Sequence, residues 1–353
     1  MSEETAAAET LPLLSVRGVS KSFPLRGGFA VRALDDVSFD VPPGTTVGIA
    51  GESGCGKTTM GHVIMGGLIA EKGEILLDDP ELGQIDIAHA DKKLRHHVRL
   101  NMQMVFQDPN ASLNPRMSLF DLVAEPLVIN RLLPRAALKP RVAVLLEQVG
   151  LSSRYMERYP HALSGGQRQR VVIARALAMN PRLIVADEPI SALDVSVQAQ
   201  TLNLLKDLQL EHRLTYLFIA HNLSVMNYFA DSTVVMYLGR VVEAGPTRTM
   251  FQAPLHPYTA ALLSSVPRLG AGKAAGKRAP EGEVPSAANP PSGCHFHPRC
   301  PFAQPLCRAE VPALRTVSPG RRARCHFAGE LDLAGASSFS TTNASTAIVG
   351  QQE

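Results

Sequence analysis

One short segment limits the folds open to this chain more than any other. The apolar run TVGIA at 46–50 leads directly into Gly51-Glu52-Ser53-Gly54-Cys55-Gly56-Lys57-Thr58. A strand, a glycine-rich loop and a helix in this order form a phosphate cradle, because the glycines let the backbone turn tightly and point successive N–H groups at a β-phosphate. Lys57 is expected to place its charge between the β- and γ-phosphates, and the Thr58 hydroxyl to bind Mg²⁺. The segment therefore predicts a nucleotide triphosphate site.

Four further elements follow that loop, in the order Gln107, LSGGQ at 163–167, LIVADE at 183–188 and His221. Asp187 ends an apolar run, where its carboxylate is expected to hold Mg²⁺, and Glu188 is placed to polarise a water that attacks the γ-phosphate. His221 follows the apolar run 217–220, and Gln107 ends the run MQMVF, where its amide is placed to bind Mg²⁺ or the attacking water. In isolation His221 would more often be structural and Gln107 a solvated loop residue. Their place in the series favours catalysis.

The sequence Leu163-Ser164-Gly165-Gly166-Gln167 opens a segment whose apolar residues recur three and four positions apart. A serine and two glycines at the start of a helix present backbone N–H groups and the positive end of the helix dipole, which together attract an anion. The chain already has a complete phosphate cradle at 51–58. This second anion site is therefore expected to complete the nucleotide site of a neighbouring subunit, although alone it would be a plain helix N-cap.

At these residues the chain resembles the nucleotide-binding subunit of an ATP-binding cassette (ABC) transporter, from residue 12 to about 267. The resemblance implies an ATPase in which the glycine loop binds ATP, LSGGQ is the signature, and LIVADE is Walker B with Glu188 catalytic. It extends the ATP-binding set to Glu52, Ser53, Thr59 and Phe23, and it makes Ser191-Ala192-Leu193-Asp194 the D-loop and His221 the switch histidine. The Phe23 ring would stack on adenine, with simple core packing as the alternative. Cys55 is expected to be a small filler and not a nucleophile.

The same resemblance implies an α/β fold with a RecA-like parallel-sheet core, an antiparallel β subdomain and a helical subdomain at about 110–180. Two subunits are expected to bind head to tail, with two ATP molecules held between the glycine loop of one and LSGGQ of the other. The residues agree, since strand patterns at 183–187 and 217–220 flank a helical pattern, and this alternation favours a mostly parallel sheet. Closure on ATP and opening after hydrolysis would be the power stroke.

Changes in composition divide the chain. Further strands are predicted at 13–23, 32–41, 74–78 and 102–108, and a helix at 59–69. The remaining segments read as a disordered leader at 1–11, a linker rich in Gly, Ala and Pro at 268–293, a four-cysteine segment at 294–327 and a disordered tail at 328–353.

Composition also limits the function. Hydrophobic residues make up 45% and charged residues 19% of the chain, as in a soluble globular protein, and a net charge of +3 is too small to argue for nucleic acid. No apolar run approaches the roughly 18–20 residues that span a bilayer, and the acidic N-terminus lacks the order of a signal peptide. We therefore expect a cytoplasmic protein, held on the inner face of the bacterial membrane by its partners.

Two stretches resemble the ATPases of dipeptide and oligopeptide importers: FQDPNASLNPRM at 106–117 with AEPL at 124–127, and LHPYT at 255–259. Within these importers the chain looks more like the ATPase subunit usually named F (F-type), whose partner is a paralogue named D (D-type). This resemblance implies a D-type paralogue as second ATPase, two permease subunits that meet the residues past Gln107, and a periplasmic or extracytoplasmic binding protein. Related importers move nickel, glutathione, murein peptides or oligosaccharides, so the cargo stays open. A soluble ABC ATPase acting on ribosomes or DNA is the other alternative, disfavoured by the single cassette without a heptad stretch.

Four cysteines cluster near the C-terminus: Cys294, Cys300, Cys307 and Cys325. In a cytoplasmic chain they are expected to share a metal ion or cluster, since thiolates are soft ligands and disulfides are rare there. Their spacings differ from the paired C-x₂-C loops of most zinc sites and also suit an iron–sulfur cube. The region resembles peptide-importer ATPases in which it carries a [4Fe–4S] cluster, which favours the cluster over Zn²⁺ or free thiols. Three histidines in the same segment are expected to pack around the site or to support its ligands, with replacement of a thiolate at a zinc site as the alternative: His295, His297 and His326.

Overall fold

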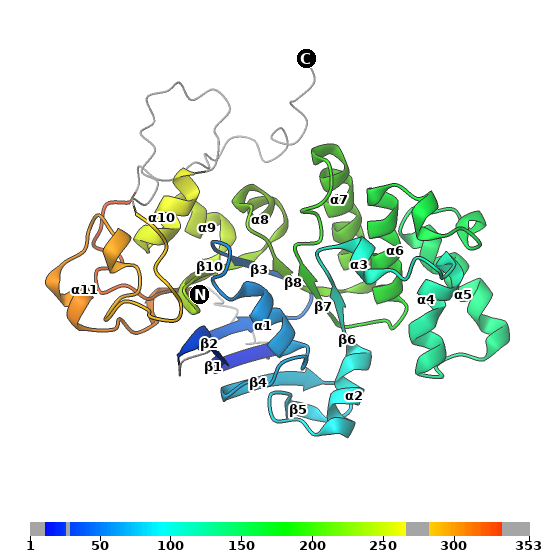
Figure 1. Ribbon diagram of the computed structural model, residues 1–353, viewed down its shortest axis with the longest axis horizontal. Helices are drawn as coiled ribbons and strands as arrows, with labels where there is room; N and C mark the ends of the chain where they lie inside the picture. The colour runs from blue at the N-terminus through cyan, green and yellow to red at the C-terminus, as the bar shows by residue number, and fades with distance from the viewer. Residues whose placement is uncertain (1–10, 26–28, 266–281, 334–353) are drawn as a thin grey trace, which may run out of the picture.

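The computed structural model describes residues 11–25, 29–265 and 282–333 (Figure 1). Residues 1–10 of the leader expected at 1–11, the linker residues 268–281 and the tail residues 334–353 lie outside that part of the chain. The described strands are β1 (Leu14–Pro24), β2 (Ala30–Val41), β3 (Thr46–Ala50), β4 (Lys72–Asp79), β5 (Gly83–Asp86), β6 (Met102–Val105), β7 (Leu183–Asp187), β8 (Thr215–Ile219), β9 (Ser232–Tyr237), β10 (Arg240–Pro246), β11 (Arg315–Ser318) and β12 (Arg321–Ala323).

The helices that connect these strands include several short ones near the C-terminus. They are α1 (Lys57–Ile64), α2 (Lys92–Asn101), α3 (Pro109–Ser112), α4 (Leu119–Ile129), α5 (Arg135–Gln148), α6 (Gly165–Leu177), α7 (Val195–His212), α8 (Leu223–Phe229), α9 (Thr247–Gln252), α10 (Pro257–Ser264) and α11 (Pro305–Ala309), with 3-10 turns at Ser153–Tyr155, Pro160–Ala162 and His297–Arg299.

The larger of two sheets has the strand order β11-β12-β10-β9-β3-β8-β7-β6. Strands β6, β7, β8, β3 and β9 run parallel, while β10, β11 and β12 pair antiparallel at the far side. Every residue of β3, β7 and β8 is buried, which explains why their sequences are continuous apolar runs without alternation. The expected parallel-sheet core is confirmed.

Alternate residues of the central strands enter two different cores. Tyr216 and Phe218 pack with apolar residues of α7–α10, whereas Leu217 and Ile219 pack with α1 and the smaller sheet. Figure 1 shows the same layers, with α7–α10 on one side of the larger sheet and α1 with the smaller sheet on the other. The smaller sheet is antiparallel, in the order β2-β1-β4-β5.

A helical lobe formed by α3–α6 lies beyond the β6 edge of the larger sheet (Figure 1). Helix α4 begins at a capping box in which Ser118 and Asp121 satisfy each other's backbone N–H groups. Leu122, Val142 and Val171, from α4, α5 and α6, are all buried in the core of the lobe. Helix α6, which begins in LSGGQ, therefore packs in the core of this lobe.

Several predicted elements differ from the observed ones in length. The strand expected at 102–108 ends at Val105, which leaves Gln107 in the loop that follows. The helix expected at 59–69 is α1, which ends at Ile64 because Gly66 turns the chain with a φ of 64°. Strands β9 to β12 were not predicted, and the last two come from the segment between the third and fourth cysteines.

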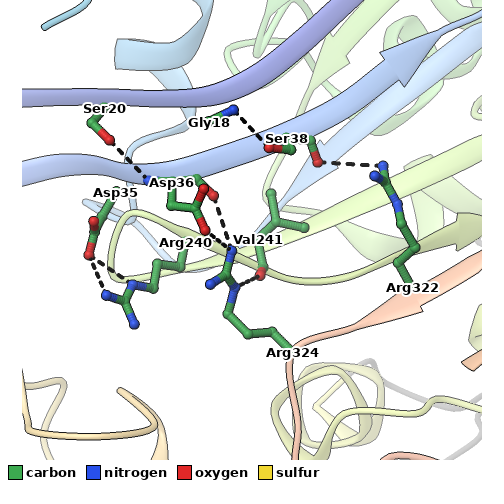
Figure 2. Close-up of polar contacts among 9 residues, drawn as sticks. All are labelled: Gly18, Ser20, Asp35, Asp36, Ser38, Arg240, Val241, Arg322 and Arg324. Atoms are coloured by element: carbon green, nitrogen blue, oxygen red, sulfur yellow. Dashed lines mark hydrogen bonds and ion pairs between the residues drawn. The ribbon is translucent and has the colours of Figure 1, made fainter. Parts of the chain in front are cut away.

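The C-terminal residues extend the larger sheet instead of standing apart from it. Strand β12 pairs with β10, and a buried ion pair of 3.0 Å between Arg321 and Glu243 joins the same strands. Figure 2 shows the second attachment, in which the Arg324 guanidinium donates to the Asp36 carboxylate of β2 at 2.8 Å and to the Val241 carbonyl at 3.0 Å. Together these contacts fix the cysteine segment against both sheets.

Parts of the predicted linker and of the predicted tail also contact the rest of the chain. Within the predicted linker, the Ala287 carbonyl accepts a hydrogen bond from the Arg32 N–H at 3.3 Å. Within the predicted tail, Ala328 is buried against Ala323 and Cys325. The described end of the linker therefore contacts the cassette, and the described start of the tail packs on the cysteine segment.

Candidate functional site

The glycine-rich loop has a positive φ at all three of its glycines, a backbone that other residues adopt only with strain. Gly51 and Gly56 have φ of 152° and 106°. A Cβ at Gly51 would lie 2.3 Å from the Met236 carbonyl oxygen, and one at Gly56 would lie 2.2 Å from the Ala33 carbonyl oxygen. The loop is therefore pressed against neighbouring backbone, whereas Gly54, with a φ of 78°, faces open space.

Lys57 folds back into the loop. Its ammonium donates to the carbonyls of Gly51 and Glu52 at 2.8 and 2.9 Å, and its side chain is buried. The Lys57 ammonium therefore lies within the loop, where it is placed to bind a phosphate. Cys55 is buried beside it, and burial raises the pKa of the Cys55 thiol, so that Cys55 packs as a small apolar residue.

Two expected magnesium ligands meet where helix α1 begins and strand β7 ends. Thr58 Oγ1, in the first turn of α1, donates to Asp187 Oδ1, at the end of β7, over 3.2 Å. Asp187 is only 4% exposed, and burial raises the pKa of its carboxyl group. A buried carboxylate with one hydroxyl partner is stabilised by a cation, so the pair suits Mg²⁺ chemically.

Glu188 lies between two of the other predicted catalytic residues. Its Oε2 accepts a hydrogen bond from Gln107 Nε2 at 3.0 Å, and its Oε1 lies 3.2 Å from His221 Nδ1. Glu188 has a φ of 46°, in the left-handed region, and its N–H donates to the Ile219 carbonyl at 2.9 Å. This uncommon backbone turns the side chain out of the β7 strand and aims it between β6 and β8.

The LSGGQ segment begins α6, in the helical lobe. Ser164 and Gln167 form a capping box, in which each side chain accepts the other residue's backbone N–H. A Cβ at Gly166 would lie 2.5 Å from a Val197 methyl group, so glycine is needed for α6 to pack on the start of α7. The predicted D-loop precedes α7, and there Ser191 Oγ donates to the Glu188 carbonyl at 3.0 Å.

The structure therefore brings together Lys57, Thr58, Gln107, Asp187, Glu188 and His221, at the carboxyl ends of the parallel strands. It places the signature elsewhere, on α6 in the lobe beyond β6 (Figure 1). Phe23 lies near the end of β1, half-buried, with the Lys21 ammonium 5.6 Å from the centre of its ring.

The loop 106–117 is tied to the signature helix. Asn110 accepts a hydrogen bond from Arg168, and Arg175 donates to the Ser112 carbonyl at 2.9 Å. Arg175 also forms a 2.6 Å ion pair with Glu125, the acidic residue of the AEPL stretch. Arg168 and Arg175 both belong to α6, so the loop is bonded directly to the LSGGQ helix.

The four cysteines of the C-terminal segment line one cavity. Its other walls are mostly aromatic and apolar, and the full lining is His256, Pro257, Cys294, Phe296, His297, Cys300, Phe302, Cys307, Cys325, His326, Phe327 and Leu331. Burial raises the pKa of Cys300 to about 12 and that of Cys325 to about 11, and nearby thiols add to both shifts. Thiols forced together in an apolar pocket favour a soft cation that replaces their protons.

No group of three or more histidine, cysteine, aspartate or glutamate side chains is close enough to hold a single metal ion within the described ranges. The donor set still fits a cluster with four cysteine ligands, because all four cysteines line the same cavity and, after burial, the other three thiols raise the pKa of Cys300 further. His297 and His326 line this cavity too, whereas His295 lines a neighbouring one.

A contact that sequence reasoning missed joins the cysteine segment to the glycine loop. The Arg299 guanidinium binds the Glu52 carboxylate through both terminal nitrogens, at 2.9 and 3.1 Å. Tyr258, of the LHPYT stretch, accepts the Glu52 backbone N–H at 2.9 Å. The Glu52–Arg299 pair is separated by more than two hundred residues, so no local pattern indicated it.

Comparison with known proteins places this geometry in a family. A family model described as ABC transporter matches residues 34–191, and one described as oligopeptide/dipeptide transporter, C-terminal region, matches residues 242–307. Among solved structures, a dimeric post-hydrolysis ATP-binding cassette bound to ADP and Pi is 30% identical with a TM-score of 0.59, covering 67% of this chain and 99% of that one. The fold and the site define an ABC-type ATPase.

Full-length relatives narrow the class further. The oligopeptide transport ATP-binding protein AppF of Bacillus subtilis is 46% identical, covering 91% of this chain and 99% of that protein. The di/tripeptide transport ATP-binding protein DppF of Pseudomonas aeruginosa is also 46% identical, covering 86% and 92%. The chain belongs to the family of oligopeptide and dipeptide transport ATP-binding proteins of ABC transporters.

Another solved relative, CbiO1 of Clostridium perfringens, is described as part of an ABC transporter complex. It is 28% identical with a TM-score of 0.60, over 69% of this chain and 91% of that one. In the described part of this chain, none of the helices is both long and apolar enough to cross a bilayer.

Proposed function

We propose that this chain is the ATPase that drives uptake of di- or oligopeptides through separate membrane permease subunits. The observation that carries the proposal is the convergence of Lys57, Thr58, Asp187 and Glu188 on the glycine loop, in a chain that also has the C-terminal region of its peptide-transport relatives. The converging residues would hydrolyse ATP, and the shared C-terminal region supports peptides as the cargo.

Each residue of the nucleotide site would have a separate role in hydrolysis. When bound, Mg²⁺ neutralises charge on the phosphates, and Thr58 and Asp187 would hold it with Gln107 nearby. The glycine loop with Lys57 holds the triphosphate. Glu188 orients and polarises the attacking water, while His221, 3.2 Å from Glu188, is placed to contact the γ-phosphate from the other side.

The site is completed by a second cassette. The LSGGQ residues begin α6 in the helical lobe, where they cap their own helix and face outward: Ser164 and Gly165 are exposed. We assign them to the ATP held by the neighbouring subunit, which we take to be the D-type paralogue bound head to tail. This arrangement makes closure of the dimer depend on ATP.

The helical lobe offers the surface for the permease. Val128 and Ile129, at the end of α4, and Leu132 just after it are 53%, 70% and 44% exposed. Exposed apolar residues in a cluster are typical of interaction surfaces. The residues past Gln107, which we expect to meet the permease as well, would connect it to the signature through the contacts of Asn110 and Ser112 with α6. The protein would lie on the inner face of the membrane through these partners.

Purification from the native membrane tests the proposal. A tagged chain extracted in mild detergent should bring down two permease subunits and a paralogous ATPase, and the reconstituted complex should accumulate labelled dipeptides when ATP is supplied. Co-purification with ribosomes or DNA, or accumulation of nickel, glutathione or oligosaccharide instead of peptide, would contradict it.

For the cysteine cavity we propose a [4Fe–4S] cluster held by Cys294, Cys300, Cys307 and Cys325, with Zn²⁺ as the competing ligand. The convergence of four thiols on one cavity supports it. Its role would be structural, since the segment has only a small core of its own around Ala323. Protein purified without oxygen should contain about four iron atoms and absorb broadly near 400 nm. Stoichiometric zinc without iron would decide against the cluster.

A further inference from the structure

Glu52 places a carboxylate inside a loop that is built to receive an anion. A fixed negative charge beside a triphosphate opposes binding unless it is neutralised. The Arg299 guanidinium does so with two parallel hydrogen bonds, Nη1 to Oε2 at 2.9 Å and Nη2 to Oε1 at 3.1 Å. The Arg299 side chain is 6% exposed and that of Glu52 is 27% exposed, so water screens the pair only in part.

The backbone of Glu52 is held as firmly as its side chain. Its N–H donates to Tyr258 Oη at 2.9 Å, and its carbonyl accepts from Lys57 Nζ at 2.9 Å. Arg299 Nη1 also lies 3.4 Å from the hydroxyl oxygen of Tyr237. Every polar group of this loop residue therefore has a partner, and two of the partners come from the C-terminal part of the chain.

An aromatic cluster connects these partners to the cysteine cavity. The Phe296 ring lies 5.3 Å from that of Tyr237 and 5.4 Å from that of Tyr258, both close to edge-on. Phe296 is 1% exposed and lines the cavity with the cysteines, and Cys300 directly follows Arg299 in the chain. Tyr237, Tyr258 and Phe296 thus form a continuous set of ring contacts from the Glu52–Arg299 pair to the cavity.

We propose that Arg299 is a positioning residue of the nucleotide site: it neutralises Glu52 and fixes the loop, so that the cysteine segment sets the affinity of the cassette for MgATP. The proposal rests on the assignment of the glycine loop to ATP. It gives the C-terminal segment a part in nucleotide binding in addition to its own cofactor.

A charge effect and a purely structural effect of Arg299 predict different mutant cycles. Without Arg299, the Glu52 carboxylate faces the phosphates unpaired. If the charge matters, loss of Arg299 weakens binding strongly when Glu52 is present and much less when residue 52 carries no charge. If Arg299 only supports the fold, its loss weakens binding equally in both backgrounds.

The experiment measures the Kd of full-length protein, purified without oxygen, for the Mg²⁺ complex of a non-hydrolysable ATP analogue. R299A should raise Kd about tenfold, as expected for an uncompensated nearby charge. Against E52Q as the reference, E52Q/R299A should raise Kd by no more than about threefold, on the same reasoning. R322A is the matched control, because Arg322 lies in the same segment but reaches only the Ser38 carbonyl, 3.5 Å away (Figure 2), and its Kd should equal that of the wild type.

Three results would overturn the proposal: R299A with wild-type affinity, equal losses in the two backgrounds, or an equal loss in R322A. If R299A does not melt cooperatively, R299M, which keeps an apolar stem in the buried site, takes its place and is judged by the same criteria. The wild type is measured first. Failure of the wild type to bind the analogue would refute the nucleotide site itself, whereas binding that is insensitive to Arg299 would refute this inference alone.

Discussion

His221 Nδ1 lies 3.2 Å from Glu188 Oε1, although the two residues follow different strands of the larger sheet. The contact results from the parallel order of β7 and β8, whose carboxyl ends meet at one edge. The left-handed backbone of Glu188 turns its carboxylate toward that edge. The proposed water-polarising group and the proposed γ-phosphate contact are therefore adjacent at this edge of the sheet.

Glu188→Gln should stop turnover while leaving ATP binding intact. The amide keeps the size of the side chain, but it cannot accept a proton from water, and loss of such a group typically costs 10²–10⁴-fold in rate. Phosphate release and nucleotide binding are measured on the same sample. Glu211→Gln, at an exposed site of α7, is the control and should behave as the wild type. ATPase activity that survives in E188Q would remove Glu188 from the proposed role.

Lys57→Ala should abolish binding of MgATP, since it deletes the cation that the glycine loop holds toward the phosphates. The effect is expected to exceed ~100-fold in Kd, because a buried charge-assisted contact is worth about 3 kcal/mol. Lys139→Ala removes an exposed lysine of α5 and should have no effect. Normal affinity in K57A would contradict the phosphate assignment.

Gly56→Ala should destabilise the chain far more than Gly44→Ala. Both glycines have positive φ, 106° and 70°, but an added Cβ at Gly56 would lie 2.2 Å from the Ala33 carbonyl oxygen, and one at Gly44 meets nothing within 4 Å. The backbone penalty alone is about 1–2 kcal/mol, and the clash adds about 1–3 kcal/mol at Gly56. Urea unfolding measures both. Equal losses would show that the loop relaxes away from β2.

The free energy of unfolding should fall as the pH drops below about 6.5. Burial lowers the pKa of His256 to about 3 from its ordinary value of 6.5, so between these values the unfolded chain binds more protons on this side chain than the native chain. Stability therefore decreases toward acid by up to about 1.4 kcal/mol per pH unit from this residue.

The matched variant for this pH effect is His256→Asn. His256 Nδ1 accepts the Tyr258 N–H at the start of α10, and asparagine is a good N-cap that does not titrate. Urea unfolding from pH 7.5 to 5.5 should give a smaller slope in H256N than in the wild type, even if H256N is less stable throughout. Identical slopes would mean that His256 does not carry the effect.

The elements of the cassette were predictable because each has a local signature. The run 46–50, the glycine loop and the pattern after Ser164 specify strand, loop and helix by composition alone, and their order indicated the fold. The carboxyl edge that their strands share explains why Gln107 and His221, placed near the nucleotide by their order in the sequence, both contact Glu188. Sequence reasoning succeeded where geometry depends on neighbours in the chain.

What the sequence did not indicate depends on distant pairings. β12 is three residues long and is held by β10, some eighty residues earlier, so it has no pattern of its own. Tyr258 was recognised only as part of LHPYT, and its hydrogen bond to Glu52 appears only when the chain is folded. Arg299 lies between Cys294 and Cys300, so the sequence assigned it only to the metal-binding segment. Its partner, Glu52, lies in the glycine loop.

The central claim is that two cassettes complete each other's nucleotide sites, with LSGGQ acting across the interface. Light scattering on E188Q, mixed with its paralogous ATPase and MgATP, tests this claim most directly. We predict a particle with the mass of one copy of each chain. It should return to single chains when MgATP is withheld, or when Ser164→Arg in this chain is combined with the same change at the signature serine of the paralogue. Single chains under all conditions would contradict the account.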